Sequence, residues 1–167
     1  MQRKLNAVAI FLSNCADNDR MRYLKKLSKL LPFDSYGACF PELRPKFGRY
    51  GGELYDDIAK NRVLQSDYKF VLAFESYVVP GYVTEKLWSS WPTGAVPIYF
   101  GAPDVRAYLP ADSLRYPKQV LMANKLSPDE LATWVKYLDS NETAYLEFVT
   151  WRSLGDQVIR EGLWRDK

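Results

Sequence analysis

Histidine is absent from this sequence of 167 residues, and only two cysteines are present. Without histidine, the chain cannot build a Ser-His-Asp triad, a Cys-His pair or a histidine-based zinc site. Its chemistry must rely on carboxylates, lysine, arginine, tyrosine and backbone amides. Proton transfer at neutral pH is therefore left to a carboxylate or to a group on another chain.

Several sequence motifs are absent as well. There is no G-x-G-x-x-G and no G-x-x-x-x-G-K-[ST], so neither a dinucleotide site nor a P-loop is predicted. No Cys/His cluster indicates a metal site. The apolar run at residues 7–12 is too short for a signal sequence or a membrane anchor. We therefore expect the chain as given to be soluble, with no membrane segment.

Neither sign of charge dominates the chain. The 23 lysines and arginines against 20 acidic residues give a net charge of +3, with both signs scattered, which does not predict a nucleic-acid partner. The length and the hydrophobic content of 47% predict one compact domain over residues 1–167. Aromatic residues make up 15% of the chain, more than a core usually needs, so we expect some rings to line a ligand surface.

Short apolar runs alternate with helical patterns along the chain. Strands are predicted at residues 7–12, 33–37, 69–74, 96–100 and 119–122. Helices are predicted at about 21–31 (after Asp17 as N-cap), 54–64, 84–91, 104–109, 126–140 and 142–154. This alternation predicts an α/β fold, an open parallel sheet with helices on both faces.

The helix near residue 130 has the clearest pattern. Ser127 at the N-cap, Pro128 and Glu130 form a capping box. The spacing predicts a buried face formed by Leu131, Trp134, Val135 and Leu138.

Polar side chains follow two of the predicted strands. Ser13, Asn14 and Arg20 follow the first strand, and a second group follows the strand at 69–74: Glu75, Ser76, Tyr82, Thr84, Glu85 and Lys86. Ligands of open parallel sheets bind at the carboxyl ends of strands, where the strand order reverses. If these two strands are neighbours there, Arg20 and Lys86 converge from two helix N-termini.

Two cations and two positive helix ends favour a diphosphate. A carboxylate such as Glu85 can accept hydrogen bonds from a pair of sugar hydroxyls. The pattern therefore predicts a nucleotide-sugar site.

These residues resemble a known family. The segment FESYVVPGYVTEKLW, followed by GAVPIYFGAP, is similar to the signature of the α1,3-fucosyltransferases, the GDP-fucose-dependent glycosyltransferase family 10. That signature runs F-E-N-S, Y-[VI]-T-E-K, then G-x-V-P-[IV]. Upstream, SNCADNDR and FDSYGAC resemble the family's S-N with a following arginine and its D-x-[YF]-G-x-C. The resemblance covers roughly residues 8–109.

The resemblance implies a role for each matching residue. Arg20 and Lys86 would bind the diphosphate of GDP-fucose, Glu85 the ribose hydroxyls, and Tyr82 the donor near its phosphates. Donor contacts are also expected from the remaining matched positions, Ser13, Asn14, Glu75 and Ser76. Ser76 stands where the family usually has asparagine, which predicts a weaker or water-mediated contact.

Members of this family have two Rossmann-like lobes, the GT-B architecture, and this chain corresponds to the C-terminal donor lobe. The acceptor site and the general base are expected in an N-terminal lobe that would precede residue 1, so no catalytic residue is identified in this chain. The implied reaction is inverting transfer of L-fucose from GDP-fucose to an N-acetylglucosamine or glucose hydroxyl of a glycan. We expect the donor lobe alone to transfer poorly or not at all.

Two further interpretations remain open, a non-catalytic GDP-sugar-binding module and a scaffold domain that binds nothing. No cofactor is required for the transfer, although Mn²⁺ is a candidate stimulator. If the gene is eukaryotic, the resemblance implies the Golgi lumen and a membrane anchor upstream.

Some individual residues have a second interpretation. Cys15 and Cys39 follow adjacent predicted strands, so they either form a disulfide or stay reduced. Glu75 either contacts the donor or caps the next helix. Asn141, in Asn-Glu-Thr, is either a glycosylation acceptor or the N-cap of the last helix, and the cap is favoured. Three rings could stack on guanine or pack in the core: Phe47, Tyr108 and Tyr116.

Overall fold

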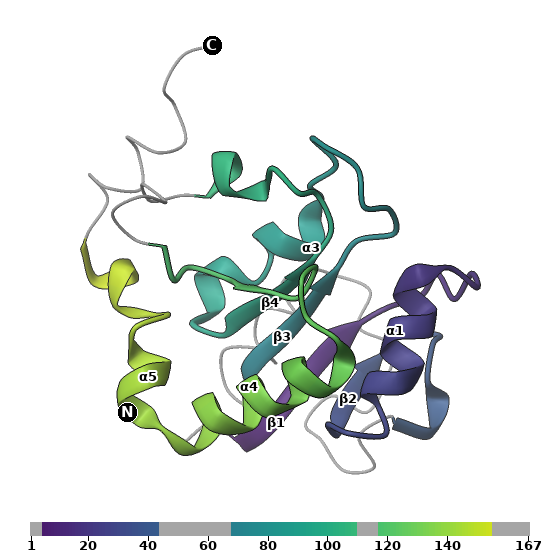
Figure 1. The fold of residues 1–167 in the computed structure, drawn as a ribbon, viewed down its shortest axis with the longest axis horizontal. Helices are drawn as coiled ribbons and strands as arrows, with labels where there is room; N and C mark the ends of the chain where they lie inside the picture. The colour runs from purple at the N-terminus through teal and green to yellow at the C-terminus, as the bar shows by residue number, and fades with distance from the viewer. Residues whose placement is uncertain (1–4, 44–67, 110–116, 155–167) are drawn as a thin grey trace.

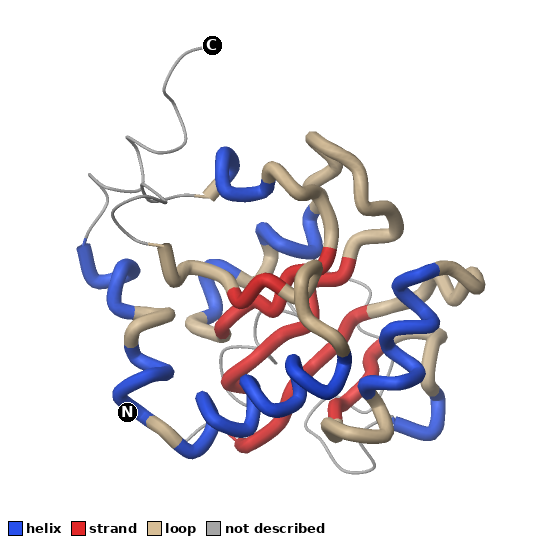
Figure 2. Tube along the Cα trace, in the orientation of Figure 1, coloured by secondary structure: helices blue, strands red, loops and turns tan. Residues whose placement is uncertain are grey.

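The structure is a computed structural model that describes residues 5–43, 68–109 and 117–154. Five parallel strands form one sheet in the order β2-β1-β3-β4-β5. The strands are β1 (Leu5–Phe11), β2 (Phe33–Tyr36), β3 (Tyr68–Phe74), β4 (Val96–Phe100) and β5 (Leu121–Met122). The open parallel sheet predicted from the sequence is confirmed (Figures 1 and 2).

One face of the sheet is covered by three helices. They are α1 (Asp19–Leu27), α4 (Pro128–Ser140) and α5 (Glu142–Leu146), with α1 and α4 side by side in front of the strands in Figure 1. Successive strand residues point to opposite faces. Alternate residues such as Ile10 and Leu72 therefore join the buried faces of these helices in the largest apolar core.

The opposite face is covered in part by a much shorter helix, α3 (Glu85–Trp88). Its Leu87 is buried with Ala73 and Tyr99, which point away from α1 and α4. Two short 3₁₀ segments flank this half of the sheet, at Trp91–Thr93 and Val105–Tyr108, whereas a third, Pro41–Leu43, lies beside β2 at the other edge. The helix expected near residues 54–64 lies outside the described residues, as do Phe47 and Tyr116.

The capping box of α4 is confirmed. The Ser127 hydroxyl accepts from the Glu130 amide, and the Glu130 carboxylate accepts from the Ser127 amide at 2.7 Å. The predicted buried face of this helix is wrong at one position. Trp134 is 46% exposed, and Ala132 takes a buried place instead, because the buried face of the helix is rotated toward Ala132 relative to the face that the spacing suggests.

Several predicted helix bounds also differ from the structure. The helix expected at 84–91 covers only Glu85–Trp88, and the helix expected at 104–109 is a 3₁₀ segment, Val105–Tyr108. The first helix begins after Asn18, whose side chain accepts from the Met21 amide, rather than after Asp17. The last predicted helix is broken into α5 and a 3₁₀ segment, Thr150–Leu154. The bonds from Phe148 to Tyr145 and from Val149 to Leu146 span three residues instead of four, which tightens the backbone and ends the α-helix.

No helix in the three described stretches combines the length and hydrophobicity that crossing a bilayer requires.

Candidate functional site

A cleft of about 470 Å³ lies at the carboxyl ends of β1 and β3. These strands are hydrogen-bonded neighbours, with Ile10 opposite Leu72. In the order β2-β1-β3-β4-β5, the direction of strand addition reverses between β1 and β3. The cleft is therefore at the switch point of the sheet, the usual ligand position in this architecture.

The cleft has two walls, which we name after the elements that form them. The β1–α1 wall contains Ser13, Asn14 and Arg20, and the β3–α3 wall contains Ser76, Glu85 and Lys86. Asn18 connects them, since its side chain amide donates to the Ser76 carbonyl at 3.4 Å.

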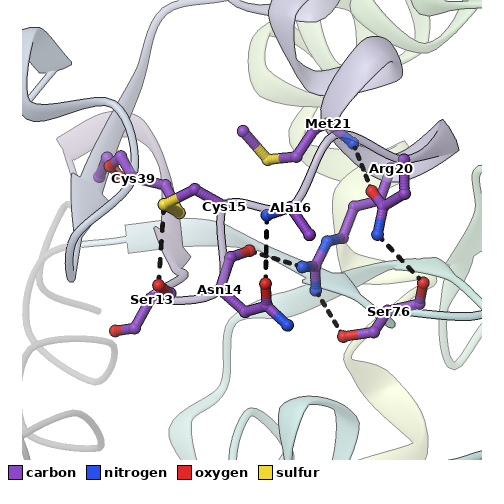
Figure 3. The surroundings of a disulfide bond; sticks show 10 residues. Ser13, Asn14, Cys15, Ala16, Arg20, Met21, Cys39 and Ser76 are labelled. Carbon is purple, nitrogen blue, oxygen red and sulfur yellow. Dashed lines mark hydrogen bonds between the residues drawn. A yellow bond between two sulfur atoms is a disulfide. The ribbon is translucent and has the colours of Figure 1, made fainter.

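The β1–α1 wall is held by a disulfide and a glycine. Cys15 and Cys39 are joined by a disulfide, one of the two states that the sequence left open (Figure 3). Gly37 has φ of 107°, and a Cβ there would lie 2.6 Å from the Leu12 carbonyl oxygen. Only glycine adopts this conformation without strain and allows the chain after β2 to approach β1 so closely.

Arg20 is the central residue of this wall, and its side chain is only 1% exposed. Its guanidinium donates to the Asn14 carbonyl at 2.7 Å, to the Ser76 hydroxyl at 3.0 Å and to the Phe74 carbonyl at 3.4 Å. Figure 3 shows it between Asn14 and Ser76. The Ser76 hydroxyl therefore positions the arginine.

The charge of Arg20 is not matched by a direct ion pair. Its Nε is buried without a hydrogen-bond partner, and no carboxylate of the described residues forms a salt bridge with it. Burial lowers the pKa of the guanidinium, and the more distant Glu75 carboxylate opposes that shift. A buried cation in this position is complementary to an anionic ligand.

The β3–α3 wall is organised by a buried carboxylate, Glu75, which is 0% exposed. Glu75 accepts from the Thr84 amide at 2.8 Å and from the Thr84 hydroxyl at 2.7 Å. Lys86 Nζ lies 3.4 Å from Glu75 and 3.1 Å from the Thr84 hydroxyl oxygen. Gly101 leaves room for this arrangement, since a Cβ there would lie 2.6 Å from Glu75 Cγ.

Glu85 lies at the edge of the same wall, with its carboxylate 3.4 Å from Lys86 Nζ. Partial burial by itself would raise the pKa of the Glu85 carboxyl. The Lys86 charge, the Glu85 backbone amide and bonds from Lys86 and Thr84 outweigh that effect and lower the pKa. Glu85 therefore stays ionised near neutral pH and can accept hydrogen bonds from ligand hydroxyls.

Six of the eight predicted donor-site residues line the cleft, namely Ser13, Asn14, Arg20, Ser76, Glu85 and Lys86. Glu75 lies behind the β3–α3 wall, where it caps α3 through Thr84, as the alternative interpretation proposed. The cleft lining does not include Tyr82, whose ring packs edge-on against Tyr77 at 5.8 Å.

The expectation of two positive helix ends needs correction. The second helix, α3, has only four residues, so few peptide dipoles align in it. The positive charge on that side comes from the Lys86 ammonium. The role of Thr84 as the N-cap of α3 was not predicted, although a threonine directly before Glu-Lys is a typical N-cap signal.

Within the described ranges, no group of three acidic, cysteine or histidine side chains is close enough to hold a metal ion. The cleft thus offers two cations for a diphosphate, one exposed carboxylate for hydroxyl groups, and an apolar floor from Phe11 and Val71.

Known proteins share this architecture. The chain superposes on the crystal structure of an α1,3-fucosyltransferase with GDP-fucose with a TM-score of 0.69 and 25% identity, over 87% of this chain and 38% of that chain. The same enzyme type with GDP gives a TM-score of 0.68 and 26% identity, covering 87% and 38%.

The sequence relatives have another name, GDP-fucose protein O-fucosyltransferase 3. The chain is 36% identical over 158 residues to GDP-fucose protein O-fucosyltransferase 3 of Xenopus laevis, covering 93% of this chain and 32% of the relative. It is 30% identical over 179 residues to the protein of that name from Homo sapiens, covering 98% and 35%. The chain thus spans about a third of the length of these relatives.

The profile described as "Glycosyltransferase family 10 (fucosyltransferase) C-term" matches residues 1–165. Together with the donor-complex neighbour and the cleft at the switch point, this match shows that the chain belongs to glycosyltransferase family 10, the fucosyltransferases.

Proposed function

We propose that residues 1–167 form the GDP-fucose-binding lobe of a fucosyltransferase. The observation that carries the proposal is the buried guanidinium of Arg20, which has an unpartnered Nε and no ion pair with the described carboxylates. A charge removed from water in this way is costly unless a counter-charge arrives. A diphosphate bound between Arg20 and Lys86 supplies that charge.

The cleft residues then have distinct tasks. Arg20 and Lys86 neutralise the diphosphate, and their positive charge is most valuable when the diphosphate leaves with its full negative charge. Glu85 accepts hydrogen bonds from the ribose hydroxyls. Glu75 and Thr84 hold the Lys86 ammonium at the cleft, with Nζ within 3.4 Å of both.

In our proposal, the transfer step also requires a general base, which this lobe does not provide. The acceptor oxygen attacks fucose C1 while the bond from C1 to the diphosphate oxygen breaks, and a base removes the hydroxyl proton on the opposite face. This geometry inverts C1. We place the base and the acceptor site in a separate N-terminal lobe and, for a eukaryotic gene, the whole protein in the Golgi lumen.

Two acceptors are possible for the whole protein. The sequence relatives, at 36% and 30% identity, are protein O-fucosyltransferases, which favours a protein hydroxyl. The structural neighbours, at 25% and 26% identity, are α1,3-fucosyltransferases, which supports the glycan hydroxyl predicted from the sequence. The higher identity makes the protein hydroxyl the stronger candidate.

Calorimetric titration of the chain with GDP and GDP-fucose tests the donor proposal, first without metal and then with Mn²⁺. We expect metal-free binding that is weakened by Lys86→Ala and lost in Arg20→Ala. Lys136→Ala on the exposed side of α4 is the matched control for loss of one positive charge. Unchanged GDP affinity in a folded Lys86→Ala variant would contradict the assignment of the cleft.

Transfer by the full-length protein separates the enzyme from a non-catalytic binding module. The assay supplies radiolabelled GDP-fucose with either a folded protein acceptor or an N-acetylglucosamine-containing glycan. Label on one acceptor class identifies the transferase and its acceptor. Donor binding without label on either supports the binding module.

A further inference from the structure

Outside the cleft, two features meet at the end of α4. Trp134 and Tyr137 form an exposed aromatic pair, and Asn141 directly after the helix begins the sequence Asn-Glu-Thr. We propose that Asn141 carries an N-linked glycan whose first sugar packs against the ring of Tyr137. The proposal rests on the lumenal location given under the proposed function.

The Asn-Glu-Thr sequence is presented at the surface. Glu142 and Thr143 are exposed, Asn141 is half-buried, and the backbone of Asn141 is extended between α4 and α5. The sequence fits N-x-[ST] with no proline in the middle position, the pattern that N-glycosylation requires.

The cap and the glycan use different atoms of Asn141, so the two interpretations are compatible. The side-chain oxygen Oδ1 accepts from the Ala144 amide at 3.0 Å and caps α5. The nitrogen Nδ2 instead donates to the Tyr137 hydroxyl at 3.3 Å. A sugar on Nδ2 replaces one amide hydrogen and leaves the capping oxygen unchanged.

The aromatic pair lies where that sugar would begin. Tyr137 is 48% exposed, Trp134 is 46% exposed, and their rings meet edge to face at 5.8 Å. The pair lies one helical turn apart on one side of α4. Pyranose rings present a face of C–H groups that packs well on aromatic rings. Nδ2 is within hydrogen-bond distance of the Tyr137 hydroxyl, so the first sugar of a glycan starts beside this ring.

The modification step is chemically balanced. Nδ2 of Asn141 attacks C1 of the N-acetylglucosamine of a lipid-diphosphate-linked oligosaccharide. A C–N bond forms, the C1–O bond breaks so that the lipid diphosphate leaves with the electron pair, and the amide proton is released to water. The donor belongs to the oxidising secretory lumen, the compartment in which the disulfide Cys15–Cys39 is stable.

Mass spectrometry of the full-length protein from a secreting animal cell tests the proposal. Release of the glycan by an N-glycosidase in ¹⁸O-water marks an occupied Asn141 as ¹⁸O-labelled aspartate. We expect occupancy in the natural protein and in Thr143→Ser, and none in Thr143→Ala or Asn141→Asp. Asn141→Asp is the informative control, because aspartate keeps the capping oxygen.

The packing on Tyr137 has its own measurement. With the glycan trimmed to one N-acetylglucosamine, we expect the melting temperature to exceed that of Asn141→Asp by about 2 °C, a difference that disappears in a Tyr137→Ala background. An unchanged difference in that background overturns the packing.

The disulfide separates this inference from the proposed location. Unmodified Asn141 beside an oxidised Cys15–Cys39 pair, scored by thiol alkylation, overturns the glycosylation alone. Unmodified Asn141 with both thiols reduced overturns the glycosylation and the lumenal location together. GDP binding is expected to be equal in Asn141→Asp and the natural protein, so donor binding is judged independently.

Discussion

The two walls of the cleft hold their cations in different ways. In the β1–α1 wall, Arg20 is 1% exposed and donates to two main-chain carbonyls and the Ser76 hydroxyl, next to a disulfide-bonded loop. In the β3–α3 wall, the Lys86 side chain is 23% exposed, and the partners of its ammonium among the described residues are side-chain oxygens. One cation is part of the folded core, whereas the other is attached to its surface. Substitutions in the first wall should therefore cost stability, and those in the second should cost affinity.

The largest effect should come from removing the disulfide of the β1–α1 wall. The bond joins positions 24 residues apart, and a loop of that size predicts a loss of about 3 kcal/mol in the free energy of unfolding. The measurement is urea unfolding of the Cys15→Ser/Cys39→Ser double variant. A midpoint equal to that of the natural chain would show that the wall does not depend on this bond.

Arg20→Ala should lower the free energy of unfolding by about 2 kcal/mol, because the buried Phe74 carbonyl, the Asn14 carbonyl and the Ser76 hydroxyl lose their donor. It should also abolish GDP binding at concentrations that saturate the natural chain. Arg20→Lys keeps the charge without the planar fork and should recover only part of either property. Urea unfolding and calorimetry measure the two losses. If Arg20→Ala kept full stability but lost GDP binding, Arg20 would contribute mainly to affinity, as expected for Lys86.

Lys86→Ala should show the opposite pattern. Lys86 is partly exposed, and the buried Glu75 carboxylate keeps both hydrogen bonds from Thr84 when the ammonium is removed, so the free energy of unfolding should fall by only about 1 kcal/mol. The affinity for GDP should fall about tenfold or more, since a charge-assisted contact to the diphosphate is lost. Glu75→Gln is a useful companion, because it keeps an acceptor for Thr84 while removing the charge behind Lys86. A large stability loss in Lys86→Ala would contradict the view that the β3–α3 wall contributes to affinity and little to stability.

The smallest expected effect concerns pH and Glu85. Its folded-state pKa is lowered below the ordinary value of 4.5, so its contribution to stability is fully present above that pH and is lost as the pH falls through the folded pKa. The difference in unfolding free energy between the natural chain and Glu85→Gln should be at most about 0.5 kcal/mol above the ordinary pKa of 4.5 and should shrink as the pH falls through the lowered folded-state pKa. A difference that grows on acidification would contradict the ion pair with Lys86.

The sequence predicted the elements whose signals are local. The continuous apolar runs at residues 69–74 and 96–100 are strands within one residue of the predicted bounds. Ser127 and Glu130 form the predicted capping box because all of its atoms lie within one helical turn. Helical periodicity predicted buried residues less reliably where the packing of a neighbouring element determines which side of the helix is covered. Trp134 has the spacing of a core residue yet lies outside the contact between α4 and the sheet.

The sequence predicted which residues form the candidate site, but not which of them line the cleft and which turn away from it. The sequence placed polar residues after two strands, and the structure brings six of the eight together. It did not show that Glu75 turns inward to Thr84, or that Tyr82 packs on Tyr77. The first outcome depends on a residue far along the chain, Gly101, whose missing side chain leaves space for Glu75. The second lies in an irregular loop without a helical or strand periodicity that would predict it.

The sequence by itself therefore determined the order of strands and helices, the helix caps and the types of chemical group present, because these depend on residues within a few positions of one another. Only the tertiary structure decided that β1 and β3 are neighbours, that Cys15 meets Cys39, and that Arg20 is buried without an ion pair to the described carboxylates. The physical reason is that burial and pairing depend on chain closure over long separations, as between Arg20 and Ser76, 56 residues apart.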